Sequence, residues 1–233
     1  MRKLDAIKAQ QLTDAEQNGV NPYAVRDTGE SGATPIPAAP QTLEHYQAAM
    51  SADLARLSPI KDIVERAKLK VSILETYWPF VADYVKNGEH YANDIAVRVC
   101  IWLFDILDIE RGLELAFVLI KQNQVTPPKF DRDLPTFVCD AVYDWANAML
   151  KEDQSASPYL DVLIATLEKE QWSLAPPVQS KLYVMLAKHK KRLGDWVSCV
   201  ALCERAEQVN PEGAGVKTLK QEAQSKLKPL APE

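Results

Sequence analysis

The chain has 233 residues, of which 47% are hydrophobic and 25% are charged, and its formal net charge is −5 at pH 7. This length suits one large or two small domains, and the apolar fraction is sufficient for a hydrophobic core. Because the chain is acidic, it is not a general nucleic-acid-binding protein, and any contact with DNA must come from local basic patches.

The first 40 residues predict an N-terminal helix and a linker. Residues 2–17 fit a short amphipathic helix, and residues 19–40 fit an extended linker marked by Pro35, Pro37 and Pro40. We expect this segment to become ordered only against a partner. The N-terminal sequence lacks the apolar region of a signal peptide, and no run in the chain approaches a membrane span, so we expect no membrane contact.

The most regular pattern is an apolar stripe in which spacings of four and three residues alternate. It predicts two amphipathic helices, about 41–57 and 59–87, within a segment 41–88 that we assign to oligomerisation and DNA contact. Ser58 and Pro59 suit the start of the second helix, Pro79 predicts a kink or break in it, and Asn87-Gly88 predicts its end. The stripe alone favours an ordinary core-facing side, since three heptads are the minimum for a coiled coil. The alternative is a contact between copies of the chain; the stripe consists of Ile60, Val64, Ala67, Val71, Leu74 and Trp78.

Residues 89–228 predict a domain of helical hairpins, followed by a tail at 229–233. The helix at 91–107 is apolar almost all round, which is typical of a buried helix. Residues 102–116 and 187–203 share one pattern, a helix, a tight turn with Asp and a second helix, as in tetratricopeptide-like hairpins. No strand-like alternation appears, and we expect an all-α fold. Further helices are expected to begin after the caps Asp108, Asp133 and Asp195, to be opened by Ser157-Pro158 and Pro176-Pro177, and to begin at about residue 214.

Sequence signals of catalysis are weak. There is no GxxxxGK[ST] motif for nucleotide binding, and no acidic residue is followed two positions later by lysine, as in a common nuclease core. Asp131, Asp133 and Asp105 are the candidate metal ligands, but Asp133 is better explained as a helix cap. We therefore assign no catalytic residue, no metal site and no cofactor. The cysteines lie in apolar helical contexts without a CxxC motif, so we expect reduced and mostly buried thiols; they are Cys100, Cys139, Cys199 and Cys203.

Two basic clusters are candidate phosphate contacts, with a solvated helix face as the alternative for both. The first is expected to form a cationic strip beside the apolar stripe, and the second lies at a helix C-terminus, where the dipole favours cations. The first comprises Arg56, Lys61, Arg66, Lys68 and Lys70, and the second Lys188, Lys190, Lys191 and Arg192.

The chain resembles the small terminase subunits of temperate, cohesive-end tailed phages, the M-protein family. The resemblance covers roughly residues 56–228, through the stretches ETYWPFVADYVKNG, DIAVRVCIWLFDILDIERGLELAFVLIKQN, VTPPKFDRDLPTFVCDAV and LGDWVSCVALCERAEQVNPEGAGVKTLKQEAQSKLK. It implies recognition of the cohesive-end site in double-stranded phage DNA, and direction of a large subunit that carries the ATPase motor and the nuclease. It also implies assembly as a ring, for which we expect the apolar stripe to be the subunit contact, and we expect the protein to act in the host cytoplasm.

Three functions remain as alternatives. The leading hypothesis is a homo-oligomeric DNA-binding packaging adaptor without an active site of its own. Members of the family are often labelled the endonuclease subunit, so the second is a metal-dependent nuclease that cuts the cohesive-end site itself. The third is a helical scaffold that binds only protein. Relatives can carry a long basic C-terminal tail, whereas this chain ends in KPLAPE, which puts DNA binding through a tail in doubt.

Overall fold

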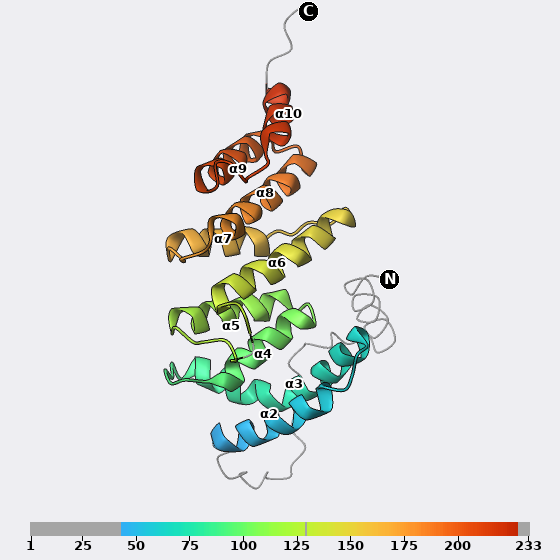
Figure 1. The fold of residues 1–233 in the computed structure, drawn as a ribbon, viewed down its shortest axis with the longest axis vertical. Helices are drawn as coiled ribbons and strands as arrows, with labels where there is room; N and C mark the ends of the chain where they lie inside the picture. Colours follow the sequence, from blue (N-terminus) through green and yellow to red (C-terminus); the bar gives the residue numbers. More distant parts are fainter. Residues whose placement is uncertain (1–42, 129, 228–233) are drawn as a thin grey trace, which may run out of the picture. The chain divides into compact units, whose positions relative to one another are not determined.

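The computed structural model describes residues 43–128 and 130–227, and this part of the chain is all α-helical, as the sequence predicted (Figure 1). The chain divides into two compact units, one ending at Leu107 and one beginning at Asp108. Unit 1 contains α2 (Leu43–Leu57), α3 (Ile63–Lys86) and α4 (Asp94–Asp105). Unit 2 contains α5 (Ile109–Lys121), α6 (Leu134–Lys151), α7 (Tyr159–Lys169), α8 (Pro176–Arg192), α9 (Trp196–Val209) and α10 (Lys217–Leu227). The predicted N-terminal helix, the linker and the tail lie outside the described residues.

Unit 1 is built around α4, which is buried on nearly every side, as predicted for the helix at 91–107. Both α2 and α3 pack against it and against each other. The Tyr77 ring lies 5.9 Å from the Trp102 ring, and its hydroxyl donates a hydrogen bond of 2.7 Å to Asp53 in α2. These contacts fix which side of α3 faces the core of the unit.

The start of α3 differs from the prediction. Asp62 is the N-cap, and its side chain accepts hydrogen bonds from the amides of Val64 at 2.8 Å and Glu65 at 2.9 Å. The prediction that Ser58 and Pro59 begin this helix is therefore wrong, because the Asp62 carboxylate satisfies the free amides of the first turn four residues later. As a consequence, Ile60 and Lys61 lie in the connection between α2 and α3.

The helix α3 continues through Pro79 and ends at the predicted position. Pro79 does not break the helix, since residues 63–86 form one element. Asn87 is the C-cap, and Gly88 has a φ of +64°, the left-handed conformation that glycine adopts at little cost.

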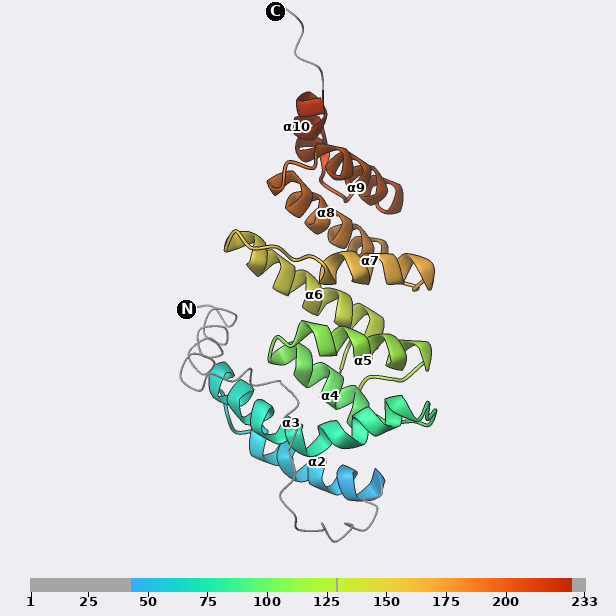
Figure 2. The same cartoon turned by 180° about the vertical axis from the view of Figure 1, so that it is seen from behind.

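In unit 2 each helix packs against the next one along the chain, and α6 also contacts α8 (Figure 2). The predicted caps are confirmed: Asp108, Asp133 and Asp195 accept hydrogen bonds from the first turns of α5, α6 and α9. The proline pair at 176–177 opens α8, as predicted. The four cysteines are free and buried, as expected for structural thiols. Within residues 43–128 and 130–227, no helix has the length and apolar character needed to cross a membrane.

Candidate nucleic-acid interface

The first basic cluster lies on and before the N-terminal half of α3. Lys61, Arg66 and Lys68 are exposed, and in the described part of the chain no ion pair involves them. Arg66 and Lys68 are two residues apart on one helix, so their side chains leave α3 on opposite sides, about 200° apart. The cluster is therefore not the single strip that the sequence predicted, because Lys61 precedes the helix and Arg66 and Lys68 diverge.

Two further members of this cluster are held by carboxylates. Arg56 forms an ion pair with Asp53 at 2.7 Å, although its side chain is still 60% exposed. Lys70 forms an ion pair with Asp105 of α4, and its side chain is only 10% exposed. The Lys70 ammonium therefore lies within unit 1, where its charge is compensated, and it does not present a free positive charge to a phosphate.

Beside this ion pair lies a small pocket of about 120 Å³, lined by Ile63, Arg66, Ala67, Lys70 and Asp105. Arg66 thus stands next to the Lys70–Asp105 pair, at the end of α3 that carries the exposed Ile63. The guanidinium of Arg66 lies on the same side of α3 as Lys70, since the two are four residues apart.

The second basic cluster, at the end of α8, is mostly engaged in ion pairs within unit 2. Lys190 pairs with Asp161 at 2.8 Å and Lys191 with Glu222 at 2.5 Å. Arg192 pairs with Asp153 at 2.9 Å. Lys188 is exposed, and among the described residues no ion pair with it occurs. These three ion pairs connect α8 to α7, to α10 and to the turn after α6, so these cations stabilise unit 2.

The apolar stripe is divided by the packing of α3. Ala67 and Leu74 are buried in the core of unit 1, whereas Val64, Val71 and Trp78 are half-buried. The core-facing side of α3 runs through a different set with the same spacing: Ala67, Lys70, Leu74, Tyr77, Val81 and Tyr84. Of the predicted stripe, only Val64, Val71 and Trp78 remain partly exposed on α3 for a contact between copies.

Two of the three candidate metal ligands, Asp133 and Asp105, have other roles, and so does the nearby Asp108. Asp133 caps α6, accepting from the Thr136 amide at 2.9 Å, and Asp108 caps α5. Asp105 pairs with Lys70, and Asp131 is exposed in the loop before α6. In the described residues, no three His, Cys, Asp or Glu side chains come together as a group suited to a metal ion.

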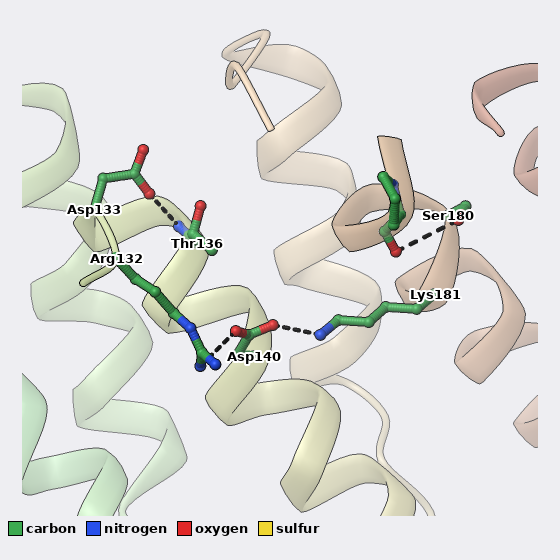
Figure 3. A network of polar contacts seen from close by, with 7 residues as sticks. Arg132, Asp133, Thr136, Asp140, Ser180 and Lys181 are labelled. Atoms are coloured by element: carbon green, nitrogen blue, oxygen red, sulfur yellow. Dashed lines mark hydrogen bonds and ion pairs between the residues drawn. The ribbon is translucent and has the colours of Figure 1, made fainter. Parts of the chain in front are cut away.

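A polar network that the sequence did not reveal connects the loop before α6 with α6 and α8 (Figure 3). Asp140 of α6 accepts from both Arg132, at 2.7 Å, and Lys181 of α8. The Lys181 ammonium also lies 4.9 Å from the centre of the Tyr143 ring. Lys181 and Asp140 are 41 residues apart, so no local pattern marks the pair. The network fixes the loop and α8 on α6, and it uses two cations that are consequently not free for DNA.

Sequence comparison defines the class of protein. Residues 47–175 match the family described as phage small terminase subunit, and the chain belongs to this family. The matched region runs from α2 to the residues just before α8, so it includes α3 and its cations but not the second basic cluster.

Two curated relatives are phage proteins. The chain is 33% identical over 171 residues to the "Probable terminase, endonuclease subunit" of Haemophilus phage HP1, which covers 68% of this chain and 60% of that protein. It is 26% identical over 219 residues to the "Terminase, endonuclease subunit" of Escherichia phage P2, covering 94% of this chain and 87% of that protein. The alignment with the HP1 protein thus spans less than two thirds of that relative. No solved structure matches the chain significantly.

Proposed function

We propose that this chain is the terminase subunit that binds the cohesive-end site of double-stranded phage DNA and directs the large subunit, which carries the ATPase and nuclease, in genome packaging in the host cytoplasm. The observation that carries the proposal is the coincidence of family membership with exposed cations on α3, inside the matched region. The protein-only scaffold has no comparable support.

The DNA contact is assigned to Lys61, Arg66 and Lys68, with Lys188 as a further contact on unit 2. Each phosphate that a cation neutralises releases counterions and makes the affinity fall more steeply with salt, by about 0.9 in log–log slope. The remaining predicted contacts are left out because each is held in an ion pair; they are Arg56, Lys70, Lys190, Lys191 and Arg192.

Assembly into a homo-oligomer, a ring by analogy with the family, is the second part of the proposal. Val64, Val71 and Trp78 are spaced by seven residues, so they lie in one row along α3, and they are half-buried. Their row borders the exposed side of α3 on which Lys68 lies. A neighbour that covers this row would therefore place cations of several copies around one duplex.

Salt-dependent binding tests the DNA contact. The triple variant K61A/R66A/K68A is compared with wild type by fluorescence anisotropy on cohesive-end DNA at several salt concentrations. We expect its log–log salt slope to be smaller in magnitude by about 2–3 per copy bound. The matched control K151A/K217A/K226A removes the same three charges from exposed lysines elsewhere and should bind nearly as wild type. An unchanged slope in the first triple variant would refute the assignment.

The mass of the native assembly tests the second part. Val71→Glu should shift the mass at micromolar concentration towards the monomer, whereas Val85→Glu, at an exposed position near the end of α3, should not. Circular dichroism shows whether both variants stay folded. A wild-type chain that is strictly monomeric at micromolar concentration would contradict the assembly.

The printed names of the two relatives favour a second candidate, cleavage of DNA by this chain itself. The purified chain is incubated with cohesive-end DNA and Mg²⁺ or Mn²⁺. Cleavage that disappears in D131N, D133N or D105N would replace the adaptor proposal by an intrinsic nuclease. Asparagine still caps helices, so D133N separates loss of a metal ligand from loss of the α6 cap.

A further inference from the structure

A groove opens on unit 2 where the C-terminal ends of α5 and α7 meet the start of α6. Its volume is about 630 Å³, and more of its surface is apolar than polar. This size falls within the range of sites that hold small ligands or peptide segments. The apolar lining consists of Phe117, Ile120, Val125, Leu134, Pro135 and Trp172.

Aromatic and apolar side chains are unusually accessible at this groove. The Trp172 indole is half-buried, and its ring centre lies 6.1 Å from that of Phe117. Val125, which also lines the groove, is 79% exposed. Apolar side chains gathered in this way around a hollow mark an interaction site more often than scattered surface residues do. The groove also lies within the region matched by the family.

The groove offers hydrogen-bond donors as well as apolar surface. Trp172, Asn123 and Ser173 belong to its lining, and each carries a side-chain N–H or O–H group. A bound helix satisfies its own backbone and needs few such donors, whereas an extended segment presents free carbonyl groups. The lining therefore suits an extended apolar chain better than a helix.

The chain itself contains a segment of this chemistry, outside the described residues. Thr34–Pro40 reads TPIPAAP, with three prolines and no charged side chain. Proline fixes its own φ and restricts the residue before it, so the sequence favours a polyproline II conformation, whose carbonyls have no internal partner. Segments of this kind bind in aromatic-lined grooves because they lose little conformational entropy on binding.

We propose that the groove on unit 2 binds the Thr34–Pro40 segment of a neighbouring copy. Pro40 precedes Leu43, the first residue of α2, by three residues, a span of at most about 11 Å of extended chain. We assign the contact between copies to the adjacent α3, which packs on α2, so in the assembly this segment lies close to a subunit boundary. The inference rests on the proposed function in requiring that copies assemble.

Cross-linking between full-length copies tests the proposal. One copy carries Ala39→Cys and a second, differently tagged copy carries Val125→Cys; the four native thiols are buried and do not compete. The matched control replaces Val125→Cys by Val162→Cys, which is 44% exposed on α7 and does not line the groove. After mixing and mild oxidation, we expect the linked pair to form at least about tenfold faster with the groove cysteine, because docking raises its effective concentration.

A second comparison shows whether the prolines matter. The copy with Ala39→Cys is given Pro35→Ala, Pro37→Ala and Pro40→Ala as well, and the rate of linking should fall to that of the control. Equal rates at Val125 and Val162, or a rate that is unaffected by loss of the prolines, would overturn the proposal. The mass and DNA affinity of each mixture are measured in parallel. If the assembly and its DNA binding persist without the specific link, the docking is wrong and the proposed function stands.

Discussion

We predict that Lys70 stabilises unit 1 through its ion pair with Asp105, in contrast to Lys68, which is assigned to DNA contact. Its sequence context resembles that of Arg66 and Lys68, but its ammonium pairs with Asp105 of α4 and its side chain is 10% exposed. Methionine is close to lysine in length and apolar volume, so Lys70→Met removes the charge while keeping most of the packing. The variant leaves Asp105 without the Lys70 ammonium in a site where the Asp105 side chain is 28% exposed.

The cost can be bounded from this geometry. Removing one partner of a fully buried ion pair lowers the free energy of unfolding by about 3–5 kcal/mol, whereas a solvent-exposed ion pair contributes only about 0–1 kcal/mol. Because Asp105 retains some contact with water, we expect Lys70→Met to lower the free energy of unfolding by about 1–3 kcal/mol. Asp105→Asn should cost more than this, since the group that it leaves behind, the Lys70 ammonium, is the more buried of the two. The double variant K70M/D105N should be less unstable than the sum of the single changes, by about 1–2 kcal/mol.

Urea denaturation, followed by circular dichroism, measures these free energies, and DNA binding is measured on the same proteins. Lys70→Met should leave the log–log salt slope of DNA binding at the wild-type value. Lys68→Ala should make this slope smaller in magnitude by about 0.9 per copy, while the free energy of unfolding stays unchanged. If Lys70→Met leaves the free energy of unfolding unchanged and makes the salt slope as shallow as Lys68→Ala does, then Lys70 contacts DNA and its ion pair is not structural.

Three further predictions concern unit 2 and the thiols. Asp133→Ala should destabilise the chain by about 1 kcal/mol, measured by urea denaturation, because it removes the cap of α6; Asp131→Ala, two residues earlier and exposed, should cost much less, and equal costs would contradict the capping role. Burial lowers the pKa of His189 from 6.5, so between pH 7 and 5 the folded state binds fewer protons than the unfolded state. The free energy of unfolding of the wild type should therefore fall relative to that of His189→Gln as the pH drops from 7 to 5. A difference between the two proteins that stays constant over this range would contradict the lowered pKa. Burial raises the pKa of Cys139 and Cys203 to about 12, so Ellman's reagent at pH 8 should label the native thiols far more slowly than in 6 M guanidinium chloride, and rapid native labelling would show that they are accessible.

The sequence predicted helix starts and ends correctly where residues close in sequence determine them. Asp108, Asp133 and Asp195 are caps because a carboxylate just before an apolar periodic stretch satisfies the amides of the first turn. The end of α3 at Asn87-Gly88 follows from the ease with which glycine adopts a positive φ. The same local reasoning failed at Ser58-Pro59. Asp62, four residues after Ser58, caps the helix instead, and this cap was not predicted.

The sequence did not predict features that depend on packing between distant segments. Two sets of residues on or just before α3 have the same alternation of three and four, and both include Ala67 and Leu74. Which set faces inward is decided by contacts such as Tyr77 with Trp102, from α4, and with Asp53, from α2. Similarly, Lys70 and Lys181 have partners 35 and 41 residues away, so their neutralisation is invisible in a local list of basic residues.

Most of the predicted DNA-contacting cations are held in ion pairs, and only a few are exposed. In the proposed function, the chain therefore needs to assemble so that enough exposed cations reach one duplex. The three exposed cations on or beside α3 alone give a salt slope of about −2.7 for one copy, at 0.9 for each phosphate neutralised, and Lys188 brings it to about −3.6. A DNA-binding protein with a slope of about −10 neutralises roughly eleven phosphates, which is the number of such cations in about three to four copies of the chain. Since each copy contributes little alone, DNA affinity should rise steeply with protein concentration over the range in which the assembly forms. Weakening the contact between copies should therefore weaken DNA binding as well, even when Lys61, Arg66 and Lys68 are all intact.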